Sequence, residues 1–240
     1  MIYITYGNYE SECTPAFINF NSYKEEREEV KVLVDVAFND NIKKIKKLSY
    51  NKTIDVQIGR YLVAGDYYGA ITVNLKPSHG WRDWLINVLC FGIRWHFGYK
   101  HEIQKYSEDL MNEILDVIHP GCGDKKIIIA GRSKGAAEAL MLSKSVFDIV
   151  KRKGIQHMIV GAFAPPKAMS KKQGDNIASN VGMANIYTFI HRSDIVPKLL
   201  PWFHHVPGYR IKFGDKGKNP FKTHHIVTTD RSVYDELGIY

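Results

Sequence analysis

Residues 127–140 read IIIAGRSKGAAEAL and predict a buried strand, a tight turn and a helix in direct succession. Three consecutive isoleucines are typical of a strand that is buried on both faces. Gly131 and Gly135 flank Ser133 in the pattern G-x-S-x-G, which is that of a nucleophile elbow when a strand precedes it and a helix follows. Small residues are needed there because the turn is strained and the strand packs closely on the helix. Taken alone, the stretch fits a nucleophilic Ser133 and a tight turn with an incidental serine equally well.

Similar strands and helices alternate along most of the chain. Predicted strands cover residues 126–131, 157–164, 185–190 and 206–214, and residues 60–75 predict a hairpin around Gly65-Asp66. Predicted helices cover residues 101–118 and 136–150, and residues 24–48 predict one or two amphipathic helices. Apolar strands separated by helices indicate an α/β fold with a mostly parallel central sheet and helices on both faces. A single domain is expected over residues 1–240, with residues 1–22 as a candidate N-terminal appendage.

The chain has 240 residues, and its 45% hydrophobic and 24% charged residues are typical of a globular protein. No apolar run approaches the roughly 20 residues of a membrane-spanning helix, and the first residues do not match a signal peptide. Three scattered cysteines favour free thiols in a reducing compartment, so a cytoplasmic location is expected. The formal charge of +8 comes from dispersed residues outside any recognisable nucleic-acid module. We expect no nucleic-acid partner, whereas peripheral contact with an anionic membrane surface stays open.

A nucleophilic serine needs a base and a carboxylate that orients this base. Asp194 follows a predicted strand in a short polar turn, where it fits either the triad acid or the acceptor of an Asx-turn or helix N-cap. Two histidine pairs come later, His204-His205 and then His224-His225 within residues 219–230, which we predict to be a C-terminal loop. At most one of two adjacent histidines can be the base. No metal site is predicted, because adjacent histidines cannot easily bind one ion and no cysteine or carboxylate cluster lies nearby.

Several blocks of the chain, in their order, resemble the class 3 lipase family, the fungal-type triacylglycerol lipases and their relatives. The resemblance covers about residues 60–226. Its blocks are AITVNLKPSHGWRDWL (70–85), HFGY (96–99), IIIAGRSKGAAEAL (127–140), AFAPPKA (162–168), IHRSDIVPKLLP (190–201), HHVPGYRIKF (204–213) and HHI (224–226). The resemblance implies an α/β-hydrolase fold and hydrolysis of carboxylic esters without a metal or an organic cofactor.

The same resemblance implies a catalytic triad. Ser133 would be the nucleophile, Asp194 the acid and His224 the base, with His225 as the alternative base. The block at 204–213 is structural in that family, so its histidines are set aside.

An oxyanion hole is implied at the backbone N–H groups of Ser78 and Lys134. The chain departs from the family pattern here, because the stretch before Ser78 lacks the usual arginine and glycine and Pro77 has no N–H. Arg132 replaces the usual histidine before the nucleophile, and Lys134 replaces the usual leucine after it. Two cations beside the serine fit an anionic substrate, and they fit equally a site that is no longer selected for lipase chemistry.

The segment WRDWLINVLCFGIRW (81–95) lies where related lipases carry a lid. Trp81, Trp84 and Leu85 are its candidate substrate contacts, although a buried helix after a core strand explains the same apolar residues. The expected substrate is a lipid, such as an acylglycerol or phospholipid, or a small soluble ester. A hypothesis from another class is a catalytically silent hydrolase fold used as a binding protein, which the altered residues around the serine would suit.

Overall fold

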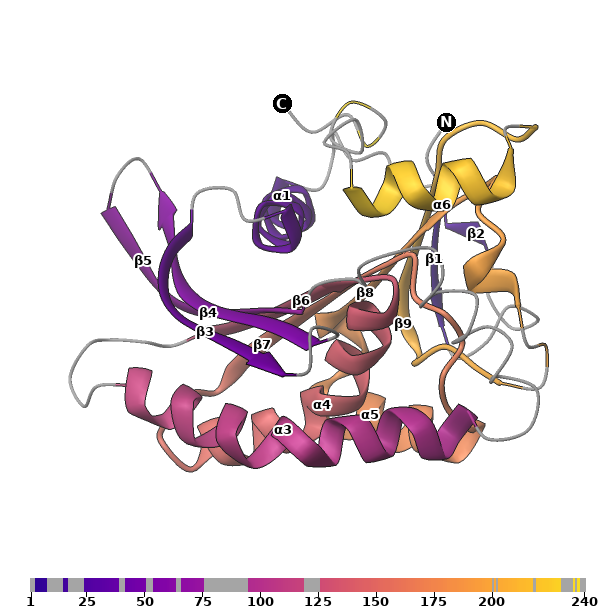
Figure 1. The fold of residues 1–240 in the computed structure, drawn as a ribbon. Helices are drawn as coiled ribbons and strands as arrows, with labels where there is room; N and C mark the ends of the chain where they lie inside the picture. Colours follow the sequence, from indigo (N-terminus) through magenta and orange to yellow (C-terminus); the bar gives the residue numbers. More distant parts are fainter. Residues whose placement is uncertain are drawn as a thin grey trace.

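A nine-stranded sheet forms the centre of the protein (Figure 1). The computed structural model of the chain describes residues 3–7, 15–16, 24–38, 42–50, 54–63, 66–75, 95–118, 126–199, 201, 203–217, 219–229, 235 and 237. In spatial order the strands are β2 (Pro15–Ala16), β1 (Tyr3–Gly7), β9 (Gly208–Phe213), β8 (Ile186–His191), β7 (His157–Phe163), β6 (Lys126–Arg132), β5 (Asp66–Leu75), β4 (Ile54–Val63) and β3 (Ile42–Tyr50). β5 to β9 run parallel, and each remaining strand is antiparallel to its inner neighbour. The mostly parallel sheet is thereby confirmed.

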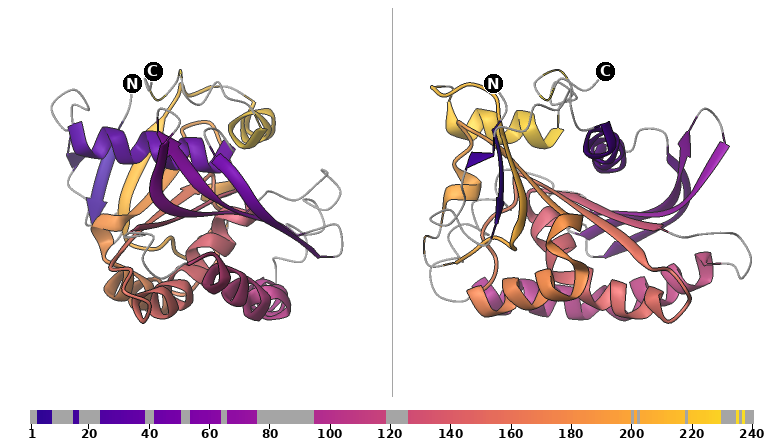
Figure 2. Two further views of the ribbon diagram at one scale, coloured as in Figure 1. Left: turned by 90° about the vertical axis from the view of Figure 1, so that its left-hand side faces the viewer. Right: turned by 180° about the vertical axis from the view of Figure 1, so that it is seen from behind.

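Helices cover both faces of this sheet, as predicted (Figures 1 and 2). α3 (Trp95–Val117), α4 (Lys134–Lys151) and α5 (Lys171–Val181) lie on one face. α1 (Lys24–Phe38) and α6 (Pro220–Thr229) lie on the other. Two short 3-10 helices, η1 (Met183–Asn185) and η2 (Val196–Lys198), flank β8. None of the described helices is both long and apolar enough to cross a membrane.

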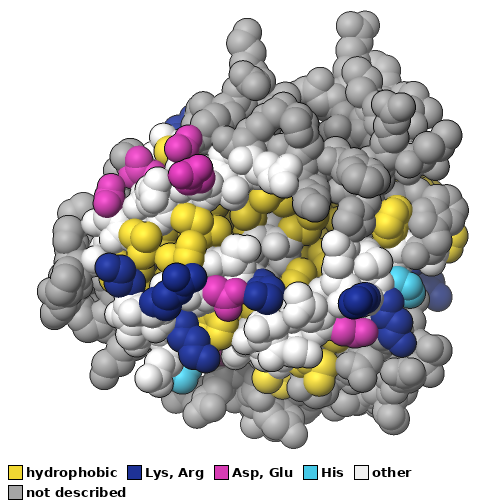
Figure 3. All heavy atoms as spheres, turned by 90° about the horizontal axis from the view of Figure 1, so that it is seen from below, with side chains coloured by type: hydrophobic (Ala, Val, Ile, Leu, Met, Phe, Trp, Pro, Cys, Tyr) yellow, Lys and Arg dark blue, Asp and Glu magenta, His cyan; other side chains and the backbone are white. Residues whose placement is uncertain are grey.

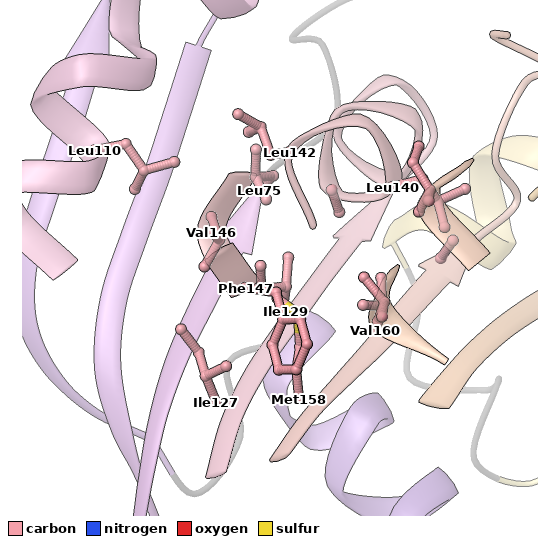
Figure 4. Close-up of a cluster of buried hydrophobic side chains, with 14 of the residues drawn as sticks. Leu75, Leu110, Ile127, Ile129, Leu140, Leu142, Val146, Phe147, Met158 and Val160 are labelled. Carbon is pink, nitrogen blue, oxygen red and sulfur yellow. The ribbon is translucent and has the colours of Figure 1, made fainter. Parts of the chain in front are cut away.

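The isoleucine run in β6 serves both layers of the core. Ile127 and Ile129 pack into the cluster beneath α3 and α4, where Leu140, Val146, Met158 and Val160 join them (Figure 4). Ile128 and Ala130 point to the opposite face and pack with Leu33 and Val34 of α1. Since alternate side chains of a strand face opposite sides, both sets must be apolar. This burial explains why the strand shows no polar alternation.

The outer surface of the α3–α4–α5 layer is mixed in character (Figure 3). Hydrophobic side chains are visible on this face, with Lys, Arg, Asp and Glu side chains interspersed among them. The part of this face that the structure describes therefore carries positive and negative side chains together.

The prediction of helices over residues 24–48 is wrong in its second half. α1 ends at Phe38, and β3 follows as the outermost strand, paired antiparallel with β4. The apolar residues of this stretch recur every three positions, at Ile42, Ile45 and Leu48, which imitates a helical stripe. In the strand, the register with β4 shifts between Lys44 and Lys46, so one residue is accommodated without a partner. Lysines are also common on edge strands, because their charge hinders pairing with a second molecule.

The other predicted helices and strands are confirmed within the described residues. β4 and β5 form the predicted hairpin, with Leu62 opposite Tyr67. The strand predicted at 206–214 is β9, and β1 pairs along it, from Tyr3 opposite Lys212 to Gly7 opposite Gly208. The described part of residues 1–22 thus extends the sheet at this edge. The organisation as a single domain stays a prediction.

Candidate active site

Ser133 occupies a sharp turn between β6 and α4. Its backbone has φ 53° and ψ −121°, a conformation that non-glycine residues rarely adopt. Two sets of hydrogen bonds hold it there. The Ser133 N–H donates to the carbonyl of Phe163 at the end of β7 (2.8 Å), and the Ser133 carbonyl accepts from the N–H groups of Ala136 and Ala137 (3.0 and 3.3 Å). The strained turn is therefore tied to the neighbouring strand and to the first turn of α4.

Gly131 is required by the close approach of β6 and α4. A Cβ atom at this position would lie 2.3 Å from the carbonyl oxygen of Gly135 and 2.8 Å from the backbone nitrogen of Ala136. Those atoms belong to the helix backbone and cannot turn aside as a side chain would. The first glycine of the G-x-S-x-G pattern thus has the packing role that the sequence predicts.

Asp194 follows β8 and its side chain is completely buried. Its Oδ1 accepts a hydrogen bond from the Val196 N–H (2.9 Å), which is an Asx-turn. Its Oδ2 lies 2.8 Å from Nδ1 of His224. The two interpretations of this aspartate are therefore compatible, because the Asx-turn uses one carboxylate oxygen and leaves the other for the histidine.

The prediction of a loop over residues 219–230 is wrong, because residues 220–229 form α6. Asn219 begins this helix: its Oδ1 accepts from the N–H groups of Phe221 and Lys222, both at 3.1 Å. Pro220 occupies the first helical position, where its missing N–H has no cost. Asparagine followed by proline is a recognised start signal for a helix, so the sequence did contain a sign of α6.

α6 presents His224 to the serine and leaves His225 exposed. The Nε2 atom of His224 lies 2.9 Å from Ser133 Oγ, and its Nδ1 atom lies 2.8 Å from Asp194 Oδ2. With Nδ1–H donated to the carboxylate, Nε2 can accept the hydroxyl proton of the serine. One continuous hydrogen-bonded chain thus links Ser133 in the β6–α4 turn, His224 in α6 and Asp194 in the turn after β8.

The earlier histidine pair is placed differently. His205 is buried, and its Nε2–H donates to the carbonyl of Pro197 (3.1 Å). Burial lowers the pKa of His205 to about 3, and the nearby Arg210 cation adds to this effect. His205 is therefore neutral and has no contact with Ser133 among the described hydrogen bonds. No group of three or more His, Cys, Asp or Glu residues suited to a metal ion occurs within the described residues.

The two cations beside Ser133 are both engaged within the protein. Lys134 is buried, with its Nζ 3.7 Å from Glu138 Oε1, and Tyr106 donates its hydroxyl to Glu138 Oε2 (3.2 Å). Arg132 donates from Nη1 to the carbonyl of Thr228 in α6 (2.6 Å). The Arg132 contact was not predicted, because no sequence signal links residue 132 to the end of a helix 96 positions later. The Lys134–Glu138 pair was not predicted either, although its i,i+4 spacing in a helix is a sequence signal for an ion pair.

Four predicted site residues, Ser78, Trp81, Trp84 and Leu85, lie outside the described residues. The other oxyanion candidate, Lys134, is the first residue of α4. First-turn N–H groups of a helix have no acceptor within the helix and point toward its N-terminal end, beside the nucleophile in this turn.

Comparisons with known proteins show the family and the fold. The family model "Lipase (class 3)" matches residues 67–204. The chain is similar to the Rhizomucor miehei lipase in its propeptide complex, with a TM-score of 0.62 and 16% identity over 80% of this chain and 69% of that one. It is also similar to a lipase from Rhizopus microsporus var. chinensis, with a TM-score of 0.56 and 16% identity over 86% and 84% of the two chains.

A further similar structure is a triacylglycerol lipase whose catalytic centre is described as a serine protease triad. Its TM-score is 0.63 and its identity 16%, over 80% of this chain and 81% of that one. At this identity the structures show a common fold. No curated protein sequence matches the chain.

Proposed function

The chain belongs to the class 3 lipase family of serine hydrolases, and on this premise we propose that it hydrolyses carboxylic esters of lipids through Ser133, His224 and Asp194. The observation that carries the proposal is the pair of contacts at His224, 2.9 Å to Ser133 Oγ and 2.8 Å to Asp194 Oδ2. Both distances are those of hydrogen bonds that can transfer or orient a proton. The candidate substrates are acylglycerols and phospholipids.

The reaction begins with attack of Ser133 Oγ on the ester carbonyl carbon, while His224 Nε2 takes the hydroxyl proton. The tetrahedral intermediate collapses when its C–O bond to the alcohol breaks and His224 returns the proton to that alcohol. A water molecule then attacks the acyl-serine ester, again with His224 as the base. The acid leaves, and Ser133 regains its proton.

Asp194 orients and stabilises His224 during these steps. Its buried carboxylate accepts Nδ1–H, which holds the imidazole in the tautomer that exposes Nε2 to the serine. The Val196 N–H bond to Oδ1 fixes the carboxylate itself. Because little water reaches this carboxylate, its negative charge acts strongly on the imidazolium that forms.

The oxyanion would be held by the backbone N–H of Lys134, with the N–H of Ser78 as the second donor. Loss of one such donor typically costs about 10²–10³ in rate. The Lys134 side chain does not take part in this role, since its ammonium group lies beside Glu138.

Specificity is proposed to come from residues away from the elbow. The two flanking cations contact Glu138 and Thr228, so they are not arranged to select an anionic substrate. We propose a lid or acyl-chain platform at Trp81, Trp84 and Leu85, and a peripheral contact with an anionic membrane surface. Hydrolysis rates on short-chain soluble esters, micellar lipid and anionic vesicles separate these possibilities. A rate that is indifferent to a lipid surface would contradict the lid.

Labelling with a fluorophosphonate probe tests the nucleophile directly, because the probe bonds covalently to an activated serine. We expect labelling of the wild type and none of Ser133→Ala. Ser143→Ala is the matched control, since Ser143 also lies in the β6–α4 region but donates its hydroxyl to the Leu140 carbonyl (2.7 Å). Ser143→Ala should label like the wild type. If the wild type does not label, the enzyme proposal fails and the catalytically silent binding protein becomes the better account.

A further inference from the structure

We propose that Arg132 is a positioning residue for the reaction, which holds α6, and through it His224, at the distance that Ser133 requires. The inference rests on the proposed function of the Ser133–His224 pair. It assigns a role to the arginine that stands directly before the nucleophile, where this family usually has a histidine.

Two hydrogen bonds connect Arg132 to the histidine. Arg132 Nη1 donates to the Thr228 carbonyl (2.6 Å), and Thr228 Oγ1 donates to the backbone carbonyl of His224 (2.8 Å). The residue before the nucleophile is thus linked to the backbone of the base. Because Arg132 and Ser133 are consecutive, any movement of α6 relative to the elbow must strain this link.

α6 benefits from such a link because those of its side chains that the structure describes provide little apolar packing. Among the α6 side chains whose burial the structure describes, Thr223, His224, Val227 and Thr228 are buried and only Val227 of these is aliphatic, while Phe221, Lys222 and His225 are exposed. A ten-residue helix is marginal without tertiary packing. Asn219 caps its amino end, and Arg132 donates to the Thr228 carbonyl at its carboxyl end, where a cation is favoured.

The surroundings of the guanidinium argue that it is kept for this contact. Arg132 lies over the ring of Phe38 at 4.9 Å, and its Nε is buried without a hydrogen-bond partner. Burial lowers the pKa of Arg132 to about 10, so it remains a cation at neutral pH. A cation that is largely removed from water is costly to keep, and Arg132 is partly buried. No carboxylate forms an ion pair with it in the described part of the chain, so the Thr228 carbonyl and the Phe38 ring are its stabilising contacts.

Phe38 also connects the guanidinium to the elbow. Its ring packs edge-on against Phe163 (5.9 Å), the residue whose carbonyl accepts the Ser133 N–H. The guanidinium is therefore held in a rigid frame that includes the turn of the nucleophile. In this frame Arg132 acts as a spacer of defined length between Ser133 and α6.

The test uses Arg132→Met, which keeps the apolar length of the side chain and removes every donor. Turnover of a soluble ester is divided by the number of active sites titrated with the fluorophosphonate probe, so unfolded protein does not count. We expect kcat per titrated site to fall on the order of 10- to 100-fold, since a displacement of about 1 Å can cost about 10²-fold. KM should be unchanged, because the base acts in the chemical step. Arg132→Lys, which keeps a cationic donor, should recover part of kcat.

Arg152→Met is the matched control. Arg152 also donates to a helix carbonyl, from Nε to Asp148 at 3.2 Å, but it is exposed at the far end of α4. Its kcat should equal that of the wild type. An Arg132→Met variant with wild-type kcat per titrated site would overturn the proposal, as would a loss confined to the number of sites. Wild-type labelling distinguishes either result from failure of the proposed function.

If Arg132→Met does not fold, Thr228→Val carries the test. It removes the hydroxyl that reaches the His224 carbonyl and keeps the carbonyl that accepts from Arg132. We expect a decrease of several-fold in kcat per titrated site with KM unchanged. An unchanged kcat in this variant would overturn the proposed link.

Discussion

Gly131 lies where β6 and α4 come so close that a single methyl group should separate them. In Gly131→Ala the new Cβ would be placed 2.3 Å from the Gly135 carbonyl oxygen and 2.5 Å from its carbon. Ordinary contact begins at 3.4 Å, so strand and helix must move apart by ~1 Å. The three nearest atoms all belong to the backbone, and therefore no rotamer change can relieve the clash.

Both stability and turnover should suffer. Overpacking costs about 1–3 kcal/mol, and a clash with rigid backbone belongs at the upper end, so we expect about 3 kcal/mol lower free energy of unfolding. The same movement displaces Ser133 or the N–H groups of the first turn of α4. A displacement of about 1 Å at a reacting group can cost about 10²-fold, which is the expected loss of kcat.

The assay combines urea unfolding followed by tryptophan fluorescence with kcat per fluorophosphonate-titrated site. Gly208→Ala is the control, because its Cβ would lie 2.5 Å from the Ile186 carbonyl oxygen. Gly208 is the first residue of β9, so this clash lies at the amino-terminal ends of the parallel strands, whereas Ser133 lies at their carboxyl-terminal ends. It should lose comparable stability and keep its kcat. A Gly131→Ala variant with wild-type midpoint and kcat would refute the argument that close packing sets the elbow.

Two further predictions concern buried polar groups. Asp194→Asn should lower kcat by about 10⁴-fold, because an amide favours the wrong tautomer of His224; turnover per titrated site checks this, and a loss below tenfold would contradict the triad. His205 stays neutral in the fold with its pKa lowered to about 3, so the unfolded chain binds an extra proton below the ordinary value of 6.5. Its contribution to stability is thus complete above about pH 6.5 and is lost toward pH 3, by at most about 1.4 kcal/mol per pH unit. The urea midpoint should therefore decrease from pH 7 to pH 5 by a larger amount in the wild type than in His205→Gln. Equal decreases in the two proteins would argue against a buried neutral histidine.

Local patterns predicted the elements whose burial is complete. The run of three isoleucines in β6 needs no knowledge of its neighbours, since a strand covered on both faces must be apolar throughout. The order strand, glycine, serine, glycine, helix predicted the turn at Ser133, because the close packing of β6 on α4 requires glycine beside the serine. In β3 the pattern misled, because the three-residue spacing of its apolar residues imitates a helix until its register irregularity and its pairing with β4 are known.

α6 shows a different kind of failure. Its start signal, Asn219-Pro220, is local and was open to prediction, but its β-branched and histidine residues have low helix propensity. Once the helix is known, consecutive residues point about 100° apart, so only one of His224 and His225 can face Ser133. Which of the two histidines faces Ser133 depends on which side of α6 packs against the rest of the protein.

The sequence by itself determined the α/β class, the turn that carries Ser133, and the candidates Asp194 and the late histidine pair, because each depends on residues that are close together in the chain. Only the tertiary structure decided that His224 meets Ser133 across 91 positions and Asp194 across 30, and that Arg132 reaches α6 across 96. Those pairings depend on how the sheet and its two helical layers place distant segments, and side-chain direction within them is set by packing that no local pattern encodes.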